Sequence, residues 1–202
     1  MSLWLDPAPL ILGSRSAARC AMLTAAGIPV ETHPADIDER EIERRAGQVN
    51  ASEAALLLAR EKARAAGANF FKRFVVGADQ TLALGERRFS KPASRDAAHE
   101  QLRALSGRTH ELHSAVAVAR DGRVVFSHVD TARLTMRTLS ERFIDSYLDA
   151  VGPDASSSVG GYQLERLGVH LFERIEGDYF TILGMPLTQL LAFLRREGSL
   201  AS

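Results

Sequence analysis

Apolar and polar residues alternate in blocks that predict strands and helices following one another along the chain. Apolar runs typical of buried strands occur at Pro9–Gly13 and from Phe74 to Ala78, and Ile28–His33 predicts a further strand. Two helices are expected in this half, one ending near Gly27 and one running from Asn50 to about Gly67. This alternation predicts an α/β fold.

The second half of the chain predicts antiparallel hairpins and further helices. Segments 110–119 and 123–136 alternate around Asp121-Gly122, which is a strong hairpin signal. A shorter hairpin is expected around Gly85-Glu86. The remaining elements expected are a helix from Ser94 to Leu105, a helix from Ser140 to before Gly152, a strand at Val169–Ile175 and a last helix starting near Pro186.

The first predicted strand runs into a helix start that is rich in hydroxyls and arginines. Ser14 or Ser16 can cap this helix, and Arg15 and Arg19 flank the cap. Arg19 in the first turn opposes the helix dipole, at a cost of a few tenths of a kcal/mol, unless an anion binds there. The pattern is typical of a phosphate site, and the alternative is a surface arginine beside an ordinary cap.

An acid and an amide, Asp79 and Gln80, follow the buried run. Gly77 and Ala78 leave room for another chain or a ligand to approach the backbone. Polar groups at a strand end face a crevice in α/β folds, so Asp79 is a candidate functional residue. The alternative is an ordinary strand-to-turn junction with Asp as the turn former.

Three further charged residues are candidates for the same site. Lys62 shares a helix face with Leu58, so it either extends its ammonium to water or points into a cleft towards an anion. Pro92 keeps Lys91 extended, so that this side chain could project from a defined loop. Glu39 lies in a mixed-charge, mostly solvated segment, from which one acid could still reach a divalent metal.

Composition limits the classes of partner and compartment. The 202 residues are 46% hydrophobic, enough for one core or two lobes sharing a cleft. The 25 basic and 25 acidic residues cancel, so no overall field attracts nucleic acid or an anionic membrane. A single cysteine, Cys20, fits a reducing compartment. With no targeting or membrane-spanning run visible, we expect a cytoplasmic protein.

Several short stretches along the chain together match the pattern of one family. The stretches are LILGSRSAAR (10–19), EKA (61–63), VVGADQT (75–81), SKP (90–92), LSGRTH (105–110), FERIEGDY (172–179) and LGMPL (183–187). Each stretch is weak alone, but the set covers nearly the whole chain in the family's order. The set resembles the Maf family of nucleoside triphosphate pyrophosphatases.

The resemblance implies a fold, a reaction and a set of site residues. The fold would be a mixed, curved central sheet flanked by helices, with two lobes around a deep cleft, in one domain that commonly dimerises. The reaction would be hydrolysis of a nucleoside triphosphate between its α and β phosphates, dependent on Mg²⁺ or Mn²⁺. Carried over residue by residue, Asp79 matches the catalytic carboxylate, Glu39 an acid near the metal, and Ser14, Arg19, Lys62 and Lys91 the phosphate contacts.

The chain departs from the family pattern in ways that bear on the substrate. The usual Ser-Pro-Arg-Arg is Ser16-Ala17-Ala18-Arg19 here, and Arg15 is expected to substitute for the missing arginine. Gln80 together with Glu165 resembles the branch that acts on 7-methyl-GTP. A carboxylate at Glu165 could accept hydrogen bonds from guanine, although Arg166 could pair with it and prevent that use.

The sequence also allows two other functions. One is a non-catalytic nucleotide-binding regulator of cell division, which would keep the basic cleft without needing Asp79. The other is a scaffold whose basic residues form only a solvated face. If the protein is an enzyme, Asp79 could deprotonate the attacking water or hold the metal.

Overall fold

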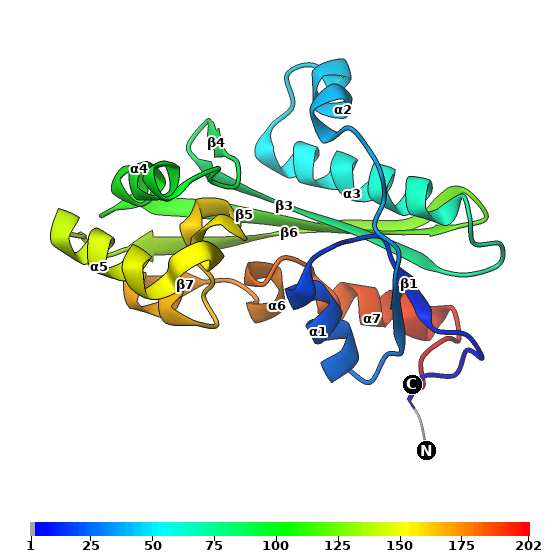
Figure 1. Ribbon diagram of the computed structural model, residues 1–202. Coiled ribbons are helices and arrows are strands. Elements are labelled where there is room, and N and C mark those ends of the chain that lie inside the picture. Colours follow the sequence, from blue (N-terminus) through cyan, green and yellow to red (C-terminus); the bar gives the residue numbers. More distant parts are fainter. Residues whose placement is uncertain (1–2) are drawn as a thin grey trace.

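A single mixed sheet runs through the molecule, which is described here as a computed structural model covering residues 3–202 (Figure 1). The strand order is β2-β1-β3-β5-β6-β7, and β4 also pairs with β3. β1 is parallel to β2 and β3, and the other pairs are antiparallel. The strands are β1 (Leu10–Leu12), β2 (Val30–Thr32), β3 (Val75–Leu84), β4 (Arg87–Phe89), β5 (Thr109–Arg120), β6 (Arg123–Met136) and β7 (Phe172–Glu176).

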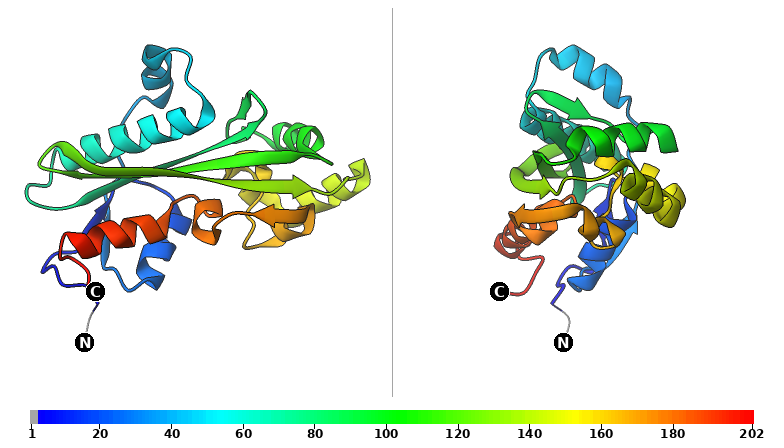
Figure 2. Two further views of the ribbon diagram at one scale, coloured as in Figure 1. Left: turned by 180° about the vertical axis from the view of Figure 1, so that it is seen from behind. Right: turned by 90° about the vertical axis from the view of Figure 1, so that its left-hand side faces the viewer.

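Helices cover both faces of this sheet. Figures 1 and 2 show α3 lying along one face, with α1, α6 and α7 on the other. The helices are α1 (Ala17–Ala25), α2 (Glu39–Ala46), α3 (Ala51–Gly67), α4 (Arg95–Leu105), α5 (Glu141–Val151), α6 (Tyr179–Ile182) and α7 (Leu187–Arg196), with 3-10 turns at η1 (Gly152–Ser156), η2 (Val159–Gly161) and η3 (Leu167–Leu171). The predicted α/β class with a mixed sheet flanked by helices is confirmed.

Buried side chains gather in two main cores at opposite ends of the long strands. One core joins β1, α1 and α7, and includes Leu12, Leu23 and Phe193. The other joins α4, α5 and the strand ends near them, and includes Leu102 and Leu148. The long strands β3, β5 and β6 run through both ends of the molecule (Figure 1).

Helix α3 approaches the sheet closely because small residues line the contact. Its alanines, among them Ala59 and Ala63, pack against alanines of β5. A Cβ on Gly77 would lie 2.2 Å from the carbonyl oxygen of Ala59. The space that Gly77 leaves is therefore taken by the chain's own helix, and not by a ligand.

A gap in the sheet exposes one edge of β3. β1 pairs with β3 only at Val75 and Val76, and β4 pairs with it only from Leu82 to Leu84. Between these contacts, residues 77–81 pair with β5 alone. Asp79 lies in this gap, beyond the carboxyl end of β1, where ligands bind in open α/β sheets.

Most element predictions hold, but two are partly wrong. Asp79 does not lie at a strand end or turn, because β3 continues through it to Leu84 and pairs it with Ala115 of β5. The long hairpin turns at Asp121, and the capping box of Asn50 with Glu53 begins α3 as expected. The predicted strand Val169–Ile175 is wrong in its first half, because the chain forms the 3-10 turn η3 before β7 starts at Phe172. Gly168 permits that turn, since a Cβ there would lie 2.3 Å from the carbonyl oxygen of Gln163.

Candidate active site

One large cavity, of about 900 Å³, opens at the gap between β1 and β4. Its lining comes from the loop after β1, from α2 and α3, from β3, and from the segments around residues 91 and 157–165. All the site residues predicted from the sequence line it, namely Ser14, Arg15, Ser16, Arg19, Glu39, Lys62, Asp79, Gln80, Lys91 and Glu165. Residues far apart in the sequence thus line one cavity.

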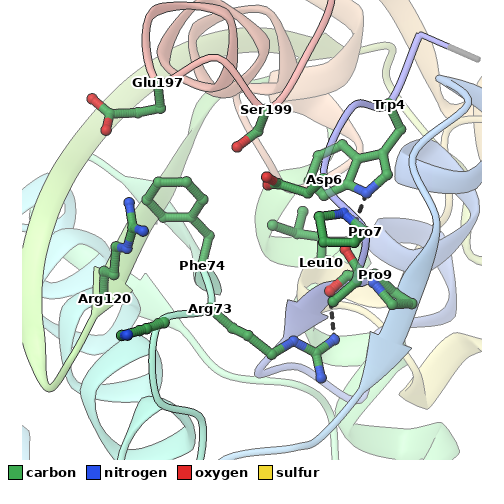
Figure 3. A pocket seen from close by; sticks show the side chains of 12 residues that line it. Trp4, Asp6, Pro7, Pro9, Leu10, Arg73, Phe74, Arg120, Glu197 and Ser199 are labelled. Atoms are coloured by element: carbon green, nitrogen blue, oxygen red, sulfur yellow. Dashed lines mark hydrogen bonds between the residues drawn. The ribbon is translucent and has the colours of Figure 1, made fainter.

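A second, smaller cavity of about 180 Å³ lies at the amino ends of β1 and β3, where the two ends of the chain meet (Figure 3). Its polar groups largely hold the N-terminal segment in place. Arg73 donates to the carbonyl oxygen of Pro9 at 2.5 Å, and the indole of Trp4 donates to Ala8 at 3.1 Å. None of the predicted site residues lines this cavity.

A lysine lies between two carboxylates at the centre of the large cavity. Lys62 Nζ is 2.5 Å from Asp79 Oδ1 and 2.7 Å from Glu39 Oε1. The Lys62 and Asp79 side chains are only 13% and 12% exposed, so their attraction is screened little by water. The sequence left open whether Lys62 extends to water or points into a cleft. The ammonium points into the cavity.

Burial changes the proton affinity of the central groups. Burial raises the pKa of the Asp79 carboxyl, although Lys62 and Arg19 oppose that rise. Burial lowers the pKa of the Lys91 ammonium, and repulsion from Arg19 and Lys62 lowers it further. A carboxylate with a raised pKa is a better proton acceptor, which suits the activation of water.

Arg19 is held firmly by main-chain groups. Its Nε donates to the carbonyl oxygen of Gly184 at 2.9 Å, and Nη1 donates to Ala78 O at 2.8 Å and to Ser14 Oγ at 3.1 Å. Ser16, and not Ser14, caps α1. Nη2 of Arg19 has no hydrogen-bond partner among residues 3–202 and is available to an anion.

Two oxygen donors in the cavity suit a hard divalent cation. Asp79 and Glu39 share Lys62, and Asp79 Oδ2 has no hydrogen-bond partner within the described chain. Within that same part of the chain, three or more His, Cys, Asp or Glu side chains do not cluster as a metal cage. Mg²⁺ commonly takes one or two protein carboxylates and completes its shell with water and substrate phosphates, so the residues present fit it.

The amide of Gln80 is oriented by its surroundings. Nε2 donates to the carbonyl oxygens of Thr181 at 3.2 Å and Ile182 at 3.0 Å, and to Ser114 Oγ at 2.9 Å. A flipped amide would place Oε1 against two carbonyl oxygens, so this orientation is the favourable one. Oε1 is left without a donor among the described residues, in the cavity wall beside Gly184.

Glu165 is also left as a free acceptor, and the expected interference from Arg166 is absent. Arg166 pairs with Asp154 at 2.8 Å, because η1 brings that acid within reach. Glu165 makes no hydrogen bond or ion pair with residues 3–202. The neighbouring Tyr162 hydroxyl contacts His110 Nε2 at 2.6 Å, which anchors this loop to β5.

Sequence reasoning missed the groups that orient Gln80 and one further lining residue. Ser114 and the carbonyls of Thr181 and Ile182 orient Gln80. They come from β5 and α6, which no local pattern connects to β3. Arg40 also lines the cavity, and it does so from the exposed, mixed-charge segment that the sequence predicted to be solvated. The only sequence signal for Arg40 is its place next to Glu39.

Sequence comparisons find a matching family and full-length relatives. The family model described as Maf-like protein matches residues 9–197. A protein of Nitrobacter hamburgensis named nucleoside triphosphate pyrophosphatase is 55% identical, with all of both chains covered. A protein of Rhizobium etli named 7-methyl-GTP pyrophosphatase is 50% identical over 95% of this chain and 97% of its own.

Similarity to solved structures is more distant. The HAM1 protein of Coxiella burnetii is 18% identical, with a TM-score of 0.42 over 63% of this chain and 72% of that one. Among residues 3–202, no helix is both long and apolar enough to cross a membrane.

Proposed function

Because the chain belongs to the Maf family, we propose that it hydrolyses a nucleoside triphosphate between the α and β phosphates. The products would be a nucleoside monophosphate and pyrophosphate. One observation carries the proposal: Asp79, Lys62, Arg19 and Lys91, from separate segments, line one cavity at a gap in the sheet. The names of full-length relatives at 50–55% identity support the same reaction class.

The side chains divide the work of binding and attack. Lys91 and Arg15 have no partner among the described residues, so both can bind phosphate oxygens without breaking an existing contact. Asp79 orients a water towards the α phosphate and accepts its proton, which its raised pKa favours. Lys62 keeps Asp79 charged and contacts the developing negative charge.

A divalent cation held in the cavity would add charge neutralisation. Glu39 and Asp79 would hold Mg²⁺ or Mn²⁺, which when bound supplies Lewis-acid stabilisation of the phosphate oxygens. Phosphate oxygens are strong anionic acceptors for Lys62, so substrate can replace the carboxylates as its partner. The ion-paired lysine thereby releases the two acids as substrate binds.

We also propose that the base is a guanine, either unmodified or as its 7-methyl derivative. Gln80 Oε1 and the Glu165 carboxylate both offer acceptors to the cavity. The Watson–Crick edge of guanine presents N1–H and the N2 amino group as donors, whereas a pyrimidine lacks that pair. The relative named 7-methyl-GTP pyrophosphatase supports this assignment.

The test is a panel of canonical and methylated nucleoside triphosphates, with Mg²⁺ or Mn²⁺ and with chelator. We expect pyrophosphate release that needs the metal and is fastest with a guanine nucleotide. Orthophosphate release would indicate cleavage at the terminal phosphate and contradict the proposed bond. Binding without turnover would instead favour the nucleotide-binding regulator. A cytoplasmic location and a homodimer stay predictions.

A further inference from the structure

The cavity contains one more unpaired cation, on a helix that contributes nothing to the core. Helix α2 has no buried residue, and Figure 1 shows it beyond α3, on the side away from the sheet. Two side chains attach it to the body: Glu39 pairs with Lys62, and Glu43 pairs with Arg88 at 3.3 Å. Both acids line the cavity. The helix therefore serves to place charged groups at the cavity edge.

Arg40 is the arginine of α2 that lacks an internal partner. The other two, Arg44 and Arg45, both pair with Glu41 on the exposed surface. Glu43, one turn from Arg40, is engaged by Arg88. Among residues 3–202, Arg40 makes no hydrogen bond, ion pair or ring contact, yet its side chain lines the cavity.

Helix electrostatics make this placement unfavourable without an anion. Arg40 is the second residue of α2, where the helix dipole disfavours a cation. Asp38 caps the helix and Glu39 and Glu41 fill the rest of the first turn, so Arg40 breaks an acidic pattern. A bound polyanion would remove that penalty, and the planar guanidinium can hold two phosphate oxygens at once.

The order of contacts along the cavity indicates which phosphates Arg40 would meet. Asp79 contacts Lys62, Lys62 contacts Glu39, and Arg40 follows Glu39 on α2. Arg40 is therefore linked to the carboxylate that prepares water for attack only through Glu39 and Lys62, and it lines the same cavity without pairing with Asp79. We propose that Arg40 is a further substrate-binding residue that holds the terminal phosphates, which leave as pyrophosphate. The assignment rests on the proposed function.

Pyrophosphate affinity tests this role without requiring turnover. Isothermal titration calorimetry with Mg²⁺ would compare the wild type with Arg40→Ala, Arg40→Lys and the matched surface variant Arg45→Ala. Loss of a charge-assisted contact predicts about a tenfold weaker pyrophosphate affinity for Arg40→Ala. Arg40→Lys should recover part of the lost affinity, because lysine keeps the charge but lacks the planar guanidinium that can contact two oxygens at once. Arg45→Ala should bind as the wild type does.

The nucleoside monophosphate product supplies the second arm. Its affinity should be the same in Arg40→Ala and in the wild type, because the α phosphate lies on the Asp79 side. Equal pyrophosphate affinities for Arg40→Ala and Arg45→Ala would overturn the assignment, and so would equal losses for pyrophosphate and monophosphate. If no nucleotide yields pyrophosphate, the proposed function fails, while the pyrophosphate affinities still decide the role of Arg40.

Discussion

Replacing Gly77 by alanine is expected to disturb the fold and the site together. The added Cβ would lie 2.2 Å from Ala59 O and 2.4 Å from Ala63 N, both in the backbone of α3. Backbone atoms cannot rotate away, so α3 must move off β3. Overpacking of this severity corresponds to about 3 kcal/mol of lost unfolding free energy. For a domain of this size, that loss lowers Tm by roughly 6–12 °C.

The same displacement should cost activity beyond the loss of stability. Lys62 lies between Ala59 and Ala63 on α3, and its ammonium is 2.5 Å from Asp79 Oδ1. A shift of about 1 Å in the position of a reacting group commonly costs a factor of about 100 in rate. Turnover measured well below the lowered Tm should therefore fall, and thermal unfolding would report the stability change.

Gly67→Ala is the matched control, because Gly67 is the last residue of α3, the helix that packs against Gly77 of β3. Its Cβ would meet Ala119 Cβ at 3.5 Å, an ordinary contact. Alanine favours a helix over glycine by about 1 kcal/mol, so this variant should be as stable as the wild type or more so. If Gly77→Ala unfolds within about 0.5 kcal/mol of Gly67→Ala, the close packing of α3 on β3 is refuted.

Three further predictions follow from charge and burial. Lys62→Met leaves the Asp79 carboxylate buried without its cation, which should cost about 3 kcal/mol at pH 8. The loss should become smaller as the pH falls, because burial raises the pKa of this acid and protonation removes the buried charge. Urea unfolding over a range of pH checks this, and a loss independent of pH would contradict it. Burial lowers the pKa of His110 to about 4. As the pH falls from 6.5 to 4, His110 is therefore protonated only in the unfolded chain, and the free energy of unfolding decreases by about 3 kcal/mol. His110→Gln should flatten this slope when urea unfolding is measured over the same pH range. Glu165→Gln should reduce the preference for guanine over pyrimidine nucleotides in kcat/KM by about tenfold, and an unchanged ratio would remove Glu165 from base recognition.

Local chemistry explains which structural predictions succeeded. The Ser16 cap, the Asn50–Glu53 capping box and the turn at Asp121 depend on neighbouring residues, so the sequence pattern contains them. The 3-10 turn η3 was not predicted, because the close approach of Gly168 to Gln163, and not a periodic pattern, determines it.

Long-range contacts explain what the sequence alone could not reveal about the site. The resemblance marked Arg19, but its bond to Gly184 joins segments 165 residues apart. The amide orientation of Gln80 depends on carbonyls 101 and 102 residues away. Whether Arg166 pairs with Glu165 or Asp154 depends on how the chain folds at η1, so pairing by proximity in sequence gave the wrong partner.

The most direct test of the central claim is turnover by Asp79→Asn, an isosteric change that removes the negative charge. The claim predicts that pyrophosphate release from the best nucleotide falls by at least about a hundredfold. The variant should remain folded and still be stabilised by the nucleotide in thermal unfolding. Asp96→Asn, on the surface of α4, serves as the control and should turn over like the wild type. Pyrophosphate release by a folded Asp79→Asn at the wild-type rate would contradict the account.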